Sequence, residues 1–428
     1  MSTEPSKVRS QPQASAMKPQ LVIIGNGIAG VRLLEEVLAA CPDRYRITVI
    51  GNEPFGAYNR IMLSPLLAGE AAMEQILIHD CDWYAQQGVQ LLAGVHYQAE
   101  QIDRVRHQVV CANGQRVPYD RLVLATGSQP AILPIPGAHA KGVMGFRGVR
   151  DVEIMQQAAQ EGGRAVVIGG GLLGLEAAHG LNRLGMQVTV VHRSKHLLNR
   201  QLDEEAAGLL QQNMEARGIA FRLGVNSRAV QTTNGLAQGL ELESGEQVSA
   251  SLIVMAAGIQ PQIELAQVSG LRCGRGVLVN DCMQTFDPKI YAVGECVEHR
   301  NLTFGLVEPL FEQARVCANH LAAHGVASYR YQESATRLKV SGIQLFSSGD
   351  FSGNRSDTQA ICYRDPGAGI YKKLVLSDNR LVGAVLYGDT EDGPWYHQLI
   401  GDQTDIAAWR GLLMFGREAS MASLQEAV

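Results

Sequence analysis

The sequence predicts an α/β fold made of two related parallel-sheet units followed by a smaller α+β domain. One observation is a pattern that occurs twice, at residues 21–30 and 164–174: an apolar run, three spaced glycines and then helical periodicity. The other is a change near Ser328 to alternating strands, with a hairpin pattern over residues 371–386. A chain of 428 residues with 46% apolar content is long enough for two or three such domains.

The first glycine pattern predicts a buried strand, a tight turn and a helix. Gly25 permits the turn, Gly27 lets a ligand pyrophosphate approach the backbone, and Gly30 lets the helix pack closely on the strand. A second apolar strand at 47–50 ends just before Glu53, where a carboxylate can bind the ribose hydroxyls of an adenine nucleotide. We therefore expect a Rossmann-like dinucleotide-binding unit, with an unrelated glycine-rich turn as the alternative.

The second glycine pattern repeats this order with Gly169, Gly171 and Gly174. The strand after its helix ends at His192 and Arg193, where an acid would bind a free ribose 2′-hydroxyl and a cation would accommodate a 2′-phosphate. We expect NADPH to be preferred over NADH, although a solvated strand end would show the same residues and use of both stays open. Two dinucleotide sites in one chain imply a relay between two cofactors.

Two further strands end in small residues that would let a ligand lie against the backbone. The predicted strand 121–124 is followed by Ala125, Thr126 and Gly127, and a strand starting at residue 252 ends in a similar way at Gly258. This internal echo supports two related domains. Between them, residues 102–119 alternate like a hairpin around an Asn-Gly turn.

A strand near Ile290 leads to Gly294 and Glu295, and a helix is predicted to begin near Glu308. The amide groups at the start of this helix would point at whatever lies in front of it. Two histidines one turn apart on the helix lack an acidic or thiol partner nearby in sequence, so we expect packed or solvated side chains rather than a metal site.

Composition argues against several classes of protein. A net charge of −5 without a basic cluster argues against nucleic acid as a partner, and no apolar run approaches the ~18 residues that cross a bilayer. Residues 1–19 are polar and lack the apolar core of a secretory signal, so we expect a disordered tail and a cytoplasmic protein. None of the eight cysteines forms a C-x-x-C pair, which argues against a local metal site and a redox dithiol.

Together these motifs resemble the flavoprotein reductases with two dinucleotide-binding domains, the pyridine nucleotide-disulfide oxidoreductases, over about residues 20–400. Residues 58–64, 305–310 and 371–375 are similar to the FAD and NAD(P)H module of assimilatory NAD(P)H nitrite reductase large subunits. The resemblance implies FAD in the first unit and NAD(P)H in the second. The implied domains are 20–140 with 281–327 for FAD, 141–280 for NAD(P)H, and 328–428 as an interface domain.

The resemblance also implies roles for individual residues. Those implied for FAD are Gly25, Gly27, Ala29, Gly30, Glu53, Arg60, Ala99, Ala125, Thr126, Gly127, Gly294 and Glu295. Those implied for NAD(P)H are Gly169, Gly171, Leu173, Gly174, His192, Arg193 and Gly258. From spacing alone, Arg60 is equally well explained as a solvated surface residue.

Two carboxylates are implied as tuning groups, Glu308 near the flavin ring and Glu176 beside the nicotinamide. In several members of the family the residue at the position of Glu176 pairs with a lysine just after a Leu-Ser step. Here Pro65 stands at that place, so the partner of Glu176 is left open, as is a structural role for it.

The departures from the family shape the expected function. Residues 58–65 contain no cysteine, so direct thiol chemistry is not expected, and no cluster of iron–sulfur or sirohaem ligands precedes Val428. We therefore expect an FAD-dependent NAD(P)H oxidoreductase that passes electrons to a separate protein in nitrate or nitrite assimilation, with a homodimer as an open assembly. The acceptor would be a nitrate or nitrite reductase subunit, a ferredoxin or a rubredoxin. The alternatives are a rubredoxin or ferredoxin reductase of another pathway and a non-catalytic NAD(P)H-sensing flavoprotein.

Overall fold

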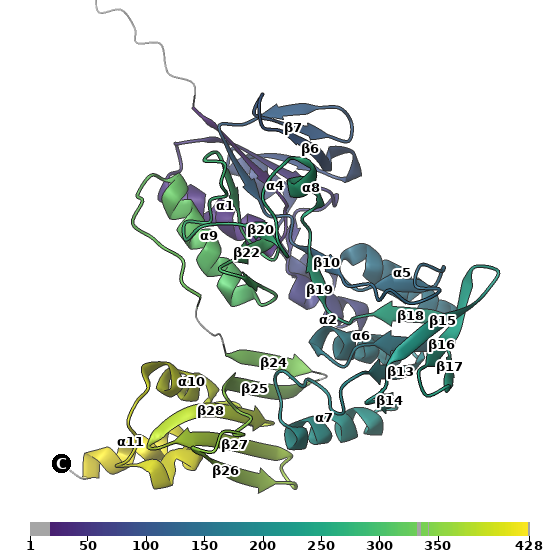
Figure 1. Ribbon diagram of the computed structural model, residues 1–428, viewed down its shortest axis with the longest axis vertical. Helices are drawn as coiled ribbons and strands as arrows, with labels where there is room; N and C mark the ends of the chain where they lie inside the picture. The colour runs from purple at the N-terminus through teal and green to yellow at the C-terminus, as the bar shows by residue number, and fades with distance from the viewer. Residues whose placement is uncertain (1–17, 332–334, 341, 427–428) are drawn as a thin grey trace, which may run out of the picture.

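A computed structural model describes residues 18–331, 335–340 and 342–426 and has the expected α/β architecture with a separate C-terminal sheet domain (Figure 1). The disordered tail expected at residues 1–19 lies outside the described residues except for Lys18 and Pro19.

The first unit is built on a five-stranded parallel sheet in the order β21-β9-β1-β2-β5. Its strands are nearly continuous buried apolar runs, as expected for a parallel sheet covered on both faces. Helix α1 follows the central strand β1 and packs beside α9 (Figure 1). The bounds are β1 Gln20–Ile24, α1 Ile28–Ala40, β2 Arg46–Gly51, β5 Gln90–Ala93, β9 Arg121–Leu124, β21 Ile290–Ala292 and α9 Val307–Leu321.

The second unit repeats this sheet strand for strand in the order β11-β18-β12-β13-β14, again with parallel pairing. Strand β12 takes the central place of β1, and α6 follows it as α1 follows β1. The two sheets differ in where their outer strand lies in the sequence, because β21 comes late in the chain whereas β11 precedes β12. The bounds are β11 Val143–Gly145, α5 Val149–Glu161, β12 Arg164–Ile168, α6 Leu172–Arg183, β13 Gln187–His192, α7 Glu204–Ala216, β14 Ala220–Leu223 and β18 Leu252–Met255.

Each unit also carries a three-stranded antiparallel sheet at the same point of its topology, before β9 or β18. The hairpin predicted over residues 102–119 is β7 and β8 around Asn113 and Gly114, and β6 adds a third strand. The duplication therefore extends beyond the glycine patterns. The bounds are β6 Ala99–Asp103, β7 Gln108–Cys111, β8 Arg116–Pro118, β15 Ser227–Thr233, β16 Leu236–Leu242 and β17 Gln247–Ser249.

A short antiparallel ribbon joins the two units. Strand β10 (Ser128–Pro130) follows β9, strand β19 (Ile259–Pro261) follows β18, and the two pair with each other. The carboxyl ends of both parallel sheets are thus tied together. Ligands of open α/β sheets bind at the carboxyl ends of the strands, so the ribbon brings the two expected sites to one region.

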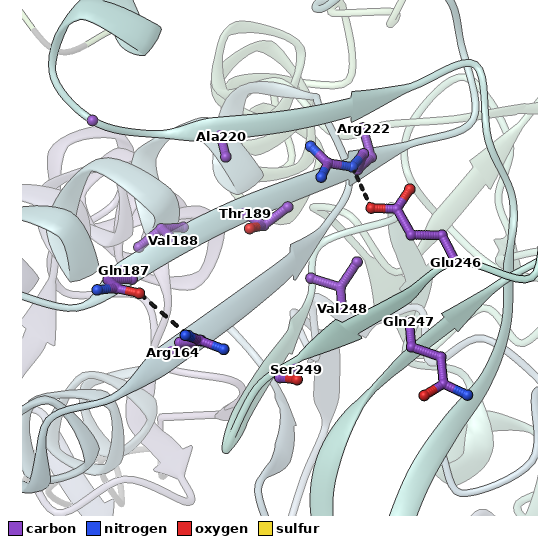
Figure 2. A pocket seen from close by; sticks show the side chains of 11 residues that line it. Arg164, Gln187, Val188, Thr189, Ala220, Arg222, Glu246, Gln247, Val248 and Ser249 are labelled. Carbon is purple, nitrogen blue, oxygen red and sulfur yellow. Dashed lines mark hydrogen bonds and ion pairs between the residues drawn. The ribbon is translucent and has the colours of Figure 1, made fainter.

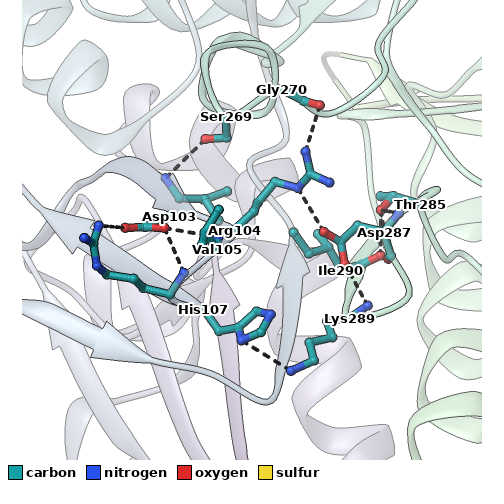
Figure 3. A network of polar contacts seen from close by, with 12 residues as sticks. Asp103, Arg104, Val105, His107, Ser269, Gly270, Thr285, Asp287, Lys289 and Ile290 are labelled. Atoms are coloured by element: carbon teal, nitrogen blue, oxygen red, sulfur yellow. Dashed lines mark hydrogen bonds and ion pairs between the residues drawn. The ribbon is translucent and has the colours of Figure 1, made fainter.

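The chain returns to the first unit before residue 280, which corrects the expected boundary of the second domain. Side chains of this stretch are buried in the core of the first unit: Ala266, Leu271 and Val277. In Figure 3 the Arg104 guanidinium donates to the Gly270 carbonyl at 3.1 Å and to the Asp287 carboxylate at 2.9 Å. The boundary falls after β19 because these apolar contacts and the arginine bind the following segment to the first unit. Its elements are α8 Glu264–Val268, β20 Val277–Leu278, β22 Val297–His299 and β23 Leu302–Thr303.

Helix α2 (Leu63–Leu67) comes from the first unit but packs against α5 and α6 of the second. The contact is close, because a Cβ placed on Gly180 would lie 2.7 Å from the side chain of Leu67. Helix α2 therefore lies at the boundary between the two units. The neighbouring elements are β3 Ala57–Tyr58, η1 Arg60–Met62, α3 Met73–Ile76, β4 Leu77–His79, α4 Cys81–Gln86 and η2 Val95–Tyr97.

The C-terminal domain is an antiparallel sheet in the order β24-β25-β28-β27-β26 with helices packed on it, as the alternating pattern predicts. It docks beside α7 of the second unit (Figure 1). Its Tyr371 hydroxyl donates to the Asp203 carboxylate at 2.7 Å, and the Lys373 amine lies 3.4 Å from the same carboxylate. The bounds are β24 Thr336–Val340, β25 Ile343–Gly349, β26 Thr358–Asp365, β27 Ile370–Ser377, β28 Arg380–Tyr387, α10 Gly393–Asp402, η3 Arg410–Phe415 and α11 Gly416–Glu426.

Candidate dinucleotide sites

The first glycine turn is so tightly packed against neighbouring backbone that it leaves no room for a side chain at two of its glycines. Gly25 has φ +117°, and a Cβ on it would lie 2.1 Å from the Ala125 carbonyl oxygen. A Cβ on Gly30 would lie 2.1 Å from the carbonyl oxygen of Gly25. Both residues must therefore be glycine for β1, β9 and α1 to meet in this way.

The start of α1 is suited to an anion. Gly27 is its N-cap, no side chain caps the helix, and its first turn has no acidic residue. The first N–H groups of a helix have no partner within the helix, and the helix dipole favours negative charge there. The Arg60 side chain lies beside this turn, 3.8 Å from the position of a Cβ on Gly27. These features fit a pyrophosphate.

Arg60 also belongs to a polar cluster at the end of β2. Its guanidinium pairs with one oxygen of the Glu53 carboxylate at 2.6 Å and donates to the Arg147 carbonyl at 2.7 Å. The Tyr58 hydroxyl donates to the other oxygen of Glu53 at 2.7 Å, and burial raises the pKa of Tyr58. The cluster fixes Glu53 just beyond β2, where the sequence pattern predicts a ribose ligand.

Thr126 and Gly127 lie at the carboxyl end of β9, as predicted. The Thr126 hydroxyl donates to the Gln262 carbonyl at 2.8 Å, and the Gln262 N–H donates to the Gly127 carbonyl at 2.9 Å. These bonds hold the first unit to the segment after β19. Ala125 is buried, and its carbonyl oxygen lies against Gly25 of the turn.

Gly294 and Glu295 close another side of this region. Gly294 has φ +94°, and a Cβ on it would lie 2.9 Å from the Cβ of Ala29, so these two predicted FAD residues are in contact. The Ser128 hydroxyl donates to the Glu295 carboxylate at 2.9 Å, and the Arg147 guanidinium pairs with the same oxygen. Arg147 and Ser128 have no motif in the sequence, and their involvement was not predicted.

The second glycine turn has nearly the same geometry as the first. Gly169 has φ +130°, and a Cβ on it would lie 2.3 Å from the Ala256 carbonyl oxygen. A Cβ on Gly174 would lie 2.0 Å from the Gly169 carbonyl oxygen. A Cβ on Gly171 would meet no described atom within 4 Å, so open space lies in front of the uncapped start of α6. Gly258 has φ +127° and also faces open space among the described atoms.

His192 and Arg193 lie at the end of β13, as predicted, but their environments differ. The His192 ring packs on Gly170, where a Cβ would lie 2.8 Å from the ring, and burial lowers the pKa of His192. The imidazole is therefore mainly neutral at neutral pH. Arg193 is exposed and supplies the permanent positive charge at this strand end.

The partner of Glu176 is Ser64. The Ser64 hydroxyl of α2 donates to the Glu176 carboxyl on α6 at 2.7 Å, across the boundary between the two units. Burial raises the pKa of Glu176 to about 7, with the hydrogen bond from Ser64 opposing that rise. The sequence does not mark Ser64 as the partner, because the family's lysine position is Pro65 here and no local pattern links residue 64 to α6, 112 residues away.

The other predicted residues have simpler settings. Leu173 lies in the first turn of α6 and packs partly against its core, and Glu308 is exposed in the first turn of α9. Ala99 begins β6 and is half-buried. A Cβ placed on Gly305, just before α9, would lie 3.2 Å from the side chain of Ile259 in β19. The start of α9 therefore lies next to the ribbon between the units.

Two hollows lie on or beside the second unit. Figure 2 shows a groove of about 430 Å³ lined by Arg164, Gln187 and Ala220, the first residues of β12, β13 and β14. It is at the amino ends of the strands and separate from the glycine turns, which lie at the carboxyl ends. A second hollow of about 400 Å³ is lined by Gln129 of the ribbon and by Asp151 of α5.

Comparison with known families decides the class. Residues 19–320 match the pyridine nucleotide-disulphide oxidoreductase family, and residues 335–404 match the rubredoxin NAD+ reductase C-terminal domain. The chain belongs to the pyridine nucleotide-disulphide oxidoreductase family. Its two dinucleotides are FAD and NAD(P)H, and the uncapped helix starts and the side-chain-free glycine turns fit such ligands.

Individual relatives support this. The chain is 45% identical over 393 residues to nitrite reductase [NAD(P)H] of Bacillus subtilis, covering 91% of this chain and 48% of the relative. It is 44% identical over 392 residues to the assimilatory nitrate reductase electron transfer subunit of the same organism, covering 91% and 50%. The chain thus spans about half the length of these relatives.

A solved structure of a covalent putidaredoxin reductase–putidaredoxin complex matches with a TM-score of 0.78 and 27% identity, covering 90% of this chain and 94% of that chain. Among the described residues, no helix is both long and apolar enough to cross a bilayer.

Proposed function

We propose that the first unit binds FAD, the second binds NAD(P)H, and the chain passes electrons from NAD(P)H through FAD to a separate electron-accepting protein in nitrate or nitrite assimilation. The ribbon β10–β19 carries this proposal, because it ties together the carboxyl ends of the two duplicated sheets. Each glycine turn lies at such an end, so both sites open toward the same region.

The residues of the chain divide the work of binding and placement. The two glycine turns and uncapped helix starts receive the pyrophosphates, and Arg60 places its guanidinium Nε beside the first. Glu295, held by Ser128 and Arg147, presents a carboxylate beside the carboxyl end of β9. When bound, FAD supplies the chemistry, since a flavin accepts a hydride and releases electrons singly.

Ser64 and Glu176 have a positioning and electrostatic role in this proposal. They join α2 and α6 across the boundary of the units, and the Glu176 carboxyl, with a pKa of about 7, can be neutral or charged near physiological pH. A neutral carboxyl avoids placing a buried negative charge where the cofactors are brought together. Residues 58–65 offer no thiol, so electrons leave the protein without a cysteine relay in this segment.

The nitrate and nitrite assignment is supported by the names of the relatives at 44–45% identity, one of which is an electron transfer subunit. A rubredoxin reductase of another pathway is the second candidate, favoured by the match of residues 335–404 to the C-terminal domain of rubredoxin NAD+ reductases. The proposed preference for NADPH rests on Arg193. The proposed cytoplasmic location rests on the need for NAD(P)H as the electron donor.

Steady-state turnover with a panel of acceptors tests the proposal. Oxidation of NAD(P)H should be fast with ferricyanide and with the catalytic subunit of an assimilatory nitrate or nitrite reductase, and slow with nitrite alone. Faster turnover with rubredoxin than with that subunit would favour the second candidate. Negligible turnover with every acceptor would indicate an NAD(P)H sensor instead, and sizing chromatography of the active form tests the homodimer.

A further inference from the structure

Three buried polar atoms lie behind the Gly294 turn without a hydrogen-bond partner among the described residues. They are the side-chain Nε2 of Gln313, the hydroxyl of Tyr329 and Nδ1 of His299. The three residues are only 0%, 1% and 1% exposed. Because buried polar groups nearly always have a partner, three such atoms on adjoining side chains favour an enclosed partner such as water.

The three side chains are neighbours. The rings of His299 and Tyr329 meet edge to face with their centroids 5.1 Å apart. Burial raises the pKa of Tyr329 to about 12, and the amide of Gln313 is near enough to oppose that rise, although no hydrogen bond of full geometry joins them. Ordered water with about three polar partners is the usual content of such a buried polar site.

One end of this cluster reaches the FAD site. The side-chain oxygen of Gln313 accepts a hydrogen bond from the Gly294 N–H at 2.8 Å, and Gly294 packs against Ala29 at the start of α1. Gln313 therefore fixes the orientation of a turn whose φ of +94° only glycine adopts readily.

The other end reaches the segment 322–331, which leads from α9 toward the C-terminal domain. Tyr329 is buried, whereas its neighbours Ser328 and Arg330 are exposed, so its side chain anchors the segment. The Tyr329 N–H donates to the Asp281 carbonyl at 2.7 Å, and the Asp281 carboxylate lies 2.8 Å from His299 Nε2. The first contact holds the segment against the first unit, and the second joins the same aspartate to His299.

We propose that Gln313, Tyr329 and His299 enclose buried water, and that Gln313 and Tyr329 are positioning residues that couple docking of segment 322–331 to the Gly294 turn of the FAD site. Loss of the tyrosine hydroxyl removes one partner of the water, which leaves the Gln313 amide free to reorient and weakens its bond to Gly294. The proposal concerns FAD binding and does not depend on the electron acceptor.

A double-mutant cycle on the full chain tests the coupling. Tyr329→Phe and Gln313→Met should each raise the dissociation constant of FAD by about tenfold, equivalent to about 1.4 kcal/mol. The dissociation constant of the double variant should exceed that of either single variant by no more than about twofold, because both changes disable the same network. Tyr331→Phe, two residues along the same segment at a site that is 42% exposed, is the control and should bind FAD like the wild type.

Hydrogen exchange gives a readout independent of activity. In the wild type, adding FAD should slow exchange of the amides of residues 322–331 as well as those of the Gly25 turn. In Tyr329→Phe the effect on 322–331 should be lost and the effect at Gly25 retained. Three results would each overturn the proposal. In the first, the two changes multiply their effects on the dissociation constant of FAD in the double variant. In the others, FAD does not slow exchange of 322–331 in the wild type, or Tyr331→Phe weakens FAD binding as much as Tyr329→Phe does. If Gln313→Met does not fold, the exchange comparison with Tyr329→Phe decides alone.

Discussion

At the scale of single residues, Glu176 has the most informative titration. Its folded-state pKa of about 7 lies above the usual 4.5, so the neutral carboxyl contributes stability that is fully present below about pH 4.5 and is lost as the pH rises through about 7. Between about pH 5 and 8 the wild type should lose on the order of 2–3 kcal/mol more unfolding free energy than Glu176→Gln. Urea unfolding of both proteins across this range measures the difference.

The hydroxyl of Ser64 provides the control for that titration. Because the Ser64 hydrogen bond lowers the pKa of Glu176, Ser64→Ala should move the loss of stability to higher pH. Identical pH profiles for the wild type, Ser64→Ala and Glu176→Gln would mean that Glu176 does not titrate in this way.

Arg193 tests the choice of nicotinamide cofactor at the same scale. It is an exposed permanent cation directly after β13, whereas burial keeps the neighbouring His192 mainly neutral. Arg193→Ala should raise the KM for NADPH by about tenfold and that for NADH by less than about twofold, because only NADPH carries the 2′-phosphate. Arg222→Ala, an exposed arginine of β14, should change neither value. Equal losses with both cofactors would remove the argument for NADPH.

Single residues also show what the sequence could and could not predict. Gly25, Gly30, Gly169 and Gly174 were predictable because their Cβ positions are filled by backbone, a demand that leaves a fixed spacing in the sequence. Their polar surroundings were not, because Arg147 reaches Glu295 from a distant part of the chain and no motif marks such a contact.

At the scale of elements, two glycines near the turn between β12 and α6 allow effects on cofactor binding to be distinguished from effects on folding. Gly171 faces open space with an ordinary φ, so Gly171→Ala should change the unfolding free energy by less than about 1 kcal/mol. The same methyl group would stand where the pyrophosphate approaches, so the KM for NAD(P)H should rise at least about tenfold while the FAD content stays unchanged.

Gly174→Ala is the matched contrast on the same helix. Its Cβ would lie 2.0 Å from the Gly169 carbonyl oxygen, so this variant should lose soluble protein or several kcal/mol of stability. Thermal unfolding and NAD(P)H kinetics of the two variants give the comparison. A stable Gly174→Ala protein, or normal NAD(P)H kinetics for Gly171→Ala, would contradict this description of the turn.

The elements were predictable to the extent that their patterns are local. Strand β1, helix α1 and the hairpin β27–β28 each carry their period and turn residues within a short stretch. The pairing of β10 with β19 and the return of α8 to the first unit depend on contacts between distant segments, so periodicity did not reveal them.

At the scale of the whole molecule, docking of the C-terminal domain depends on a few contacts with the start of α7. Tyr371 donates to Asp203 and is buried against the second unit, so Tyr371→Phe should weaken docking by about 1–2 kcal/mol. Limited proteolysis between α9 and β24 should become several times faster. Tyr363→Phe, on a site that is 42% exposed, is the control and should be cut at the wild-type rate. Equal rates for all three proteins would show that docking does not depend on this hydrogen bond.

The central claim is that two related units hold FAD and NAD(P)H so that electrons pass between them. An anaerobic titration of the purified, FAD-reconstituted protein with NADPH or NADH tests it most directly. We predict a yellow protein whose oxidised flavin absorbance is bleached by about one equivalent of nicotinamide and returns when an electron acceptor is added. A protein that stays colourless after reconstitution, or a bound flavin that neither cofactor bleaches, would contradict the claim.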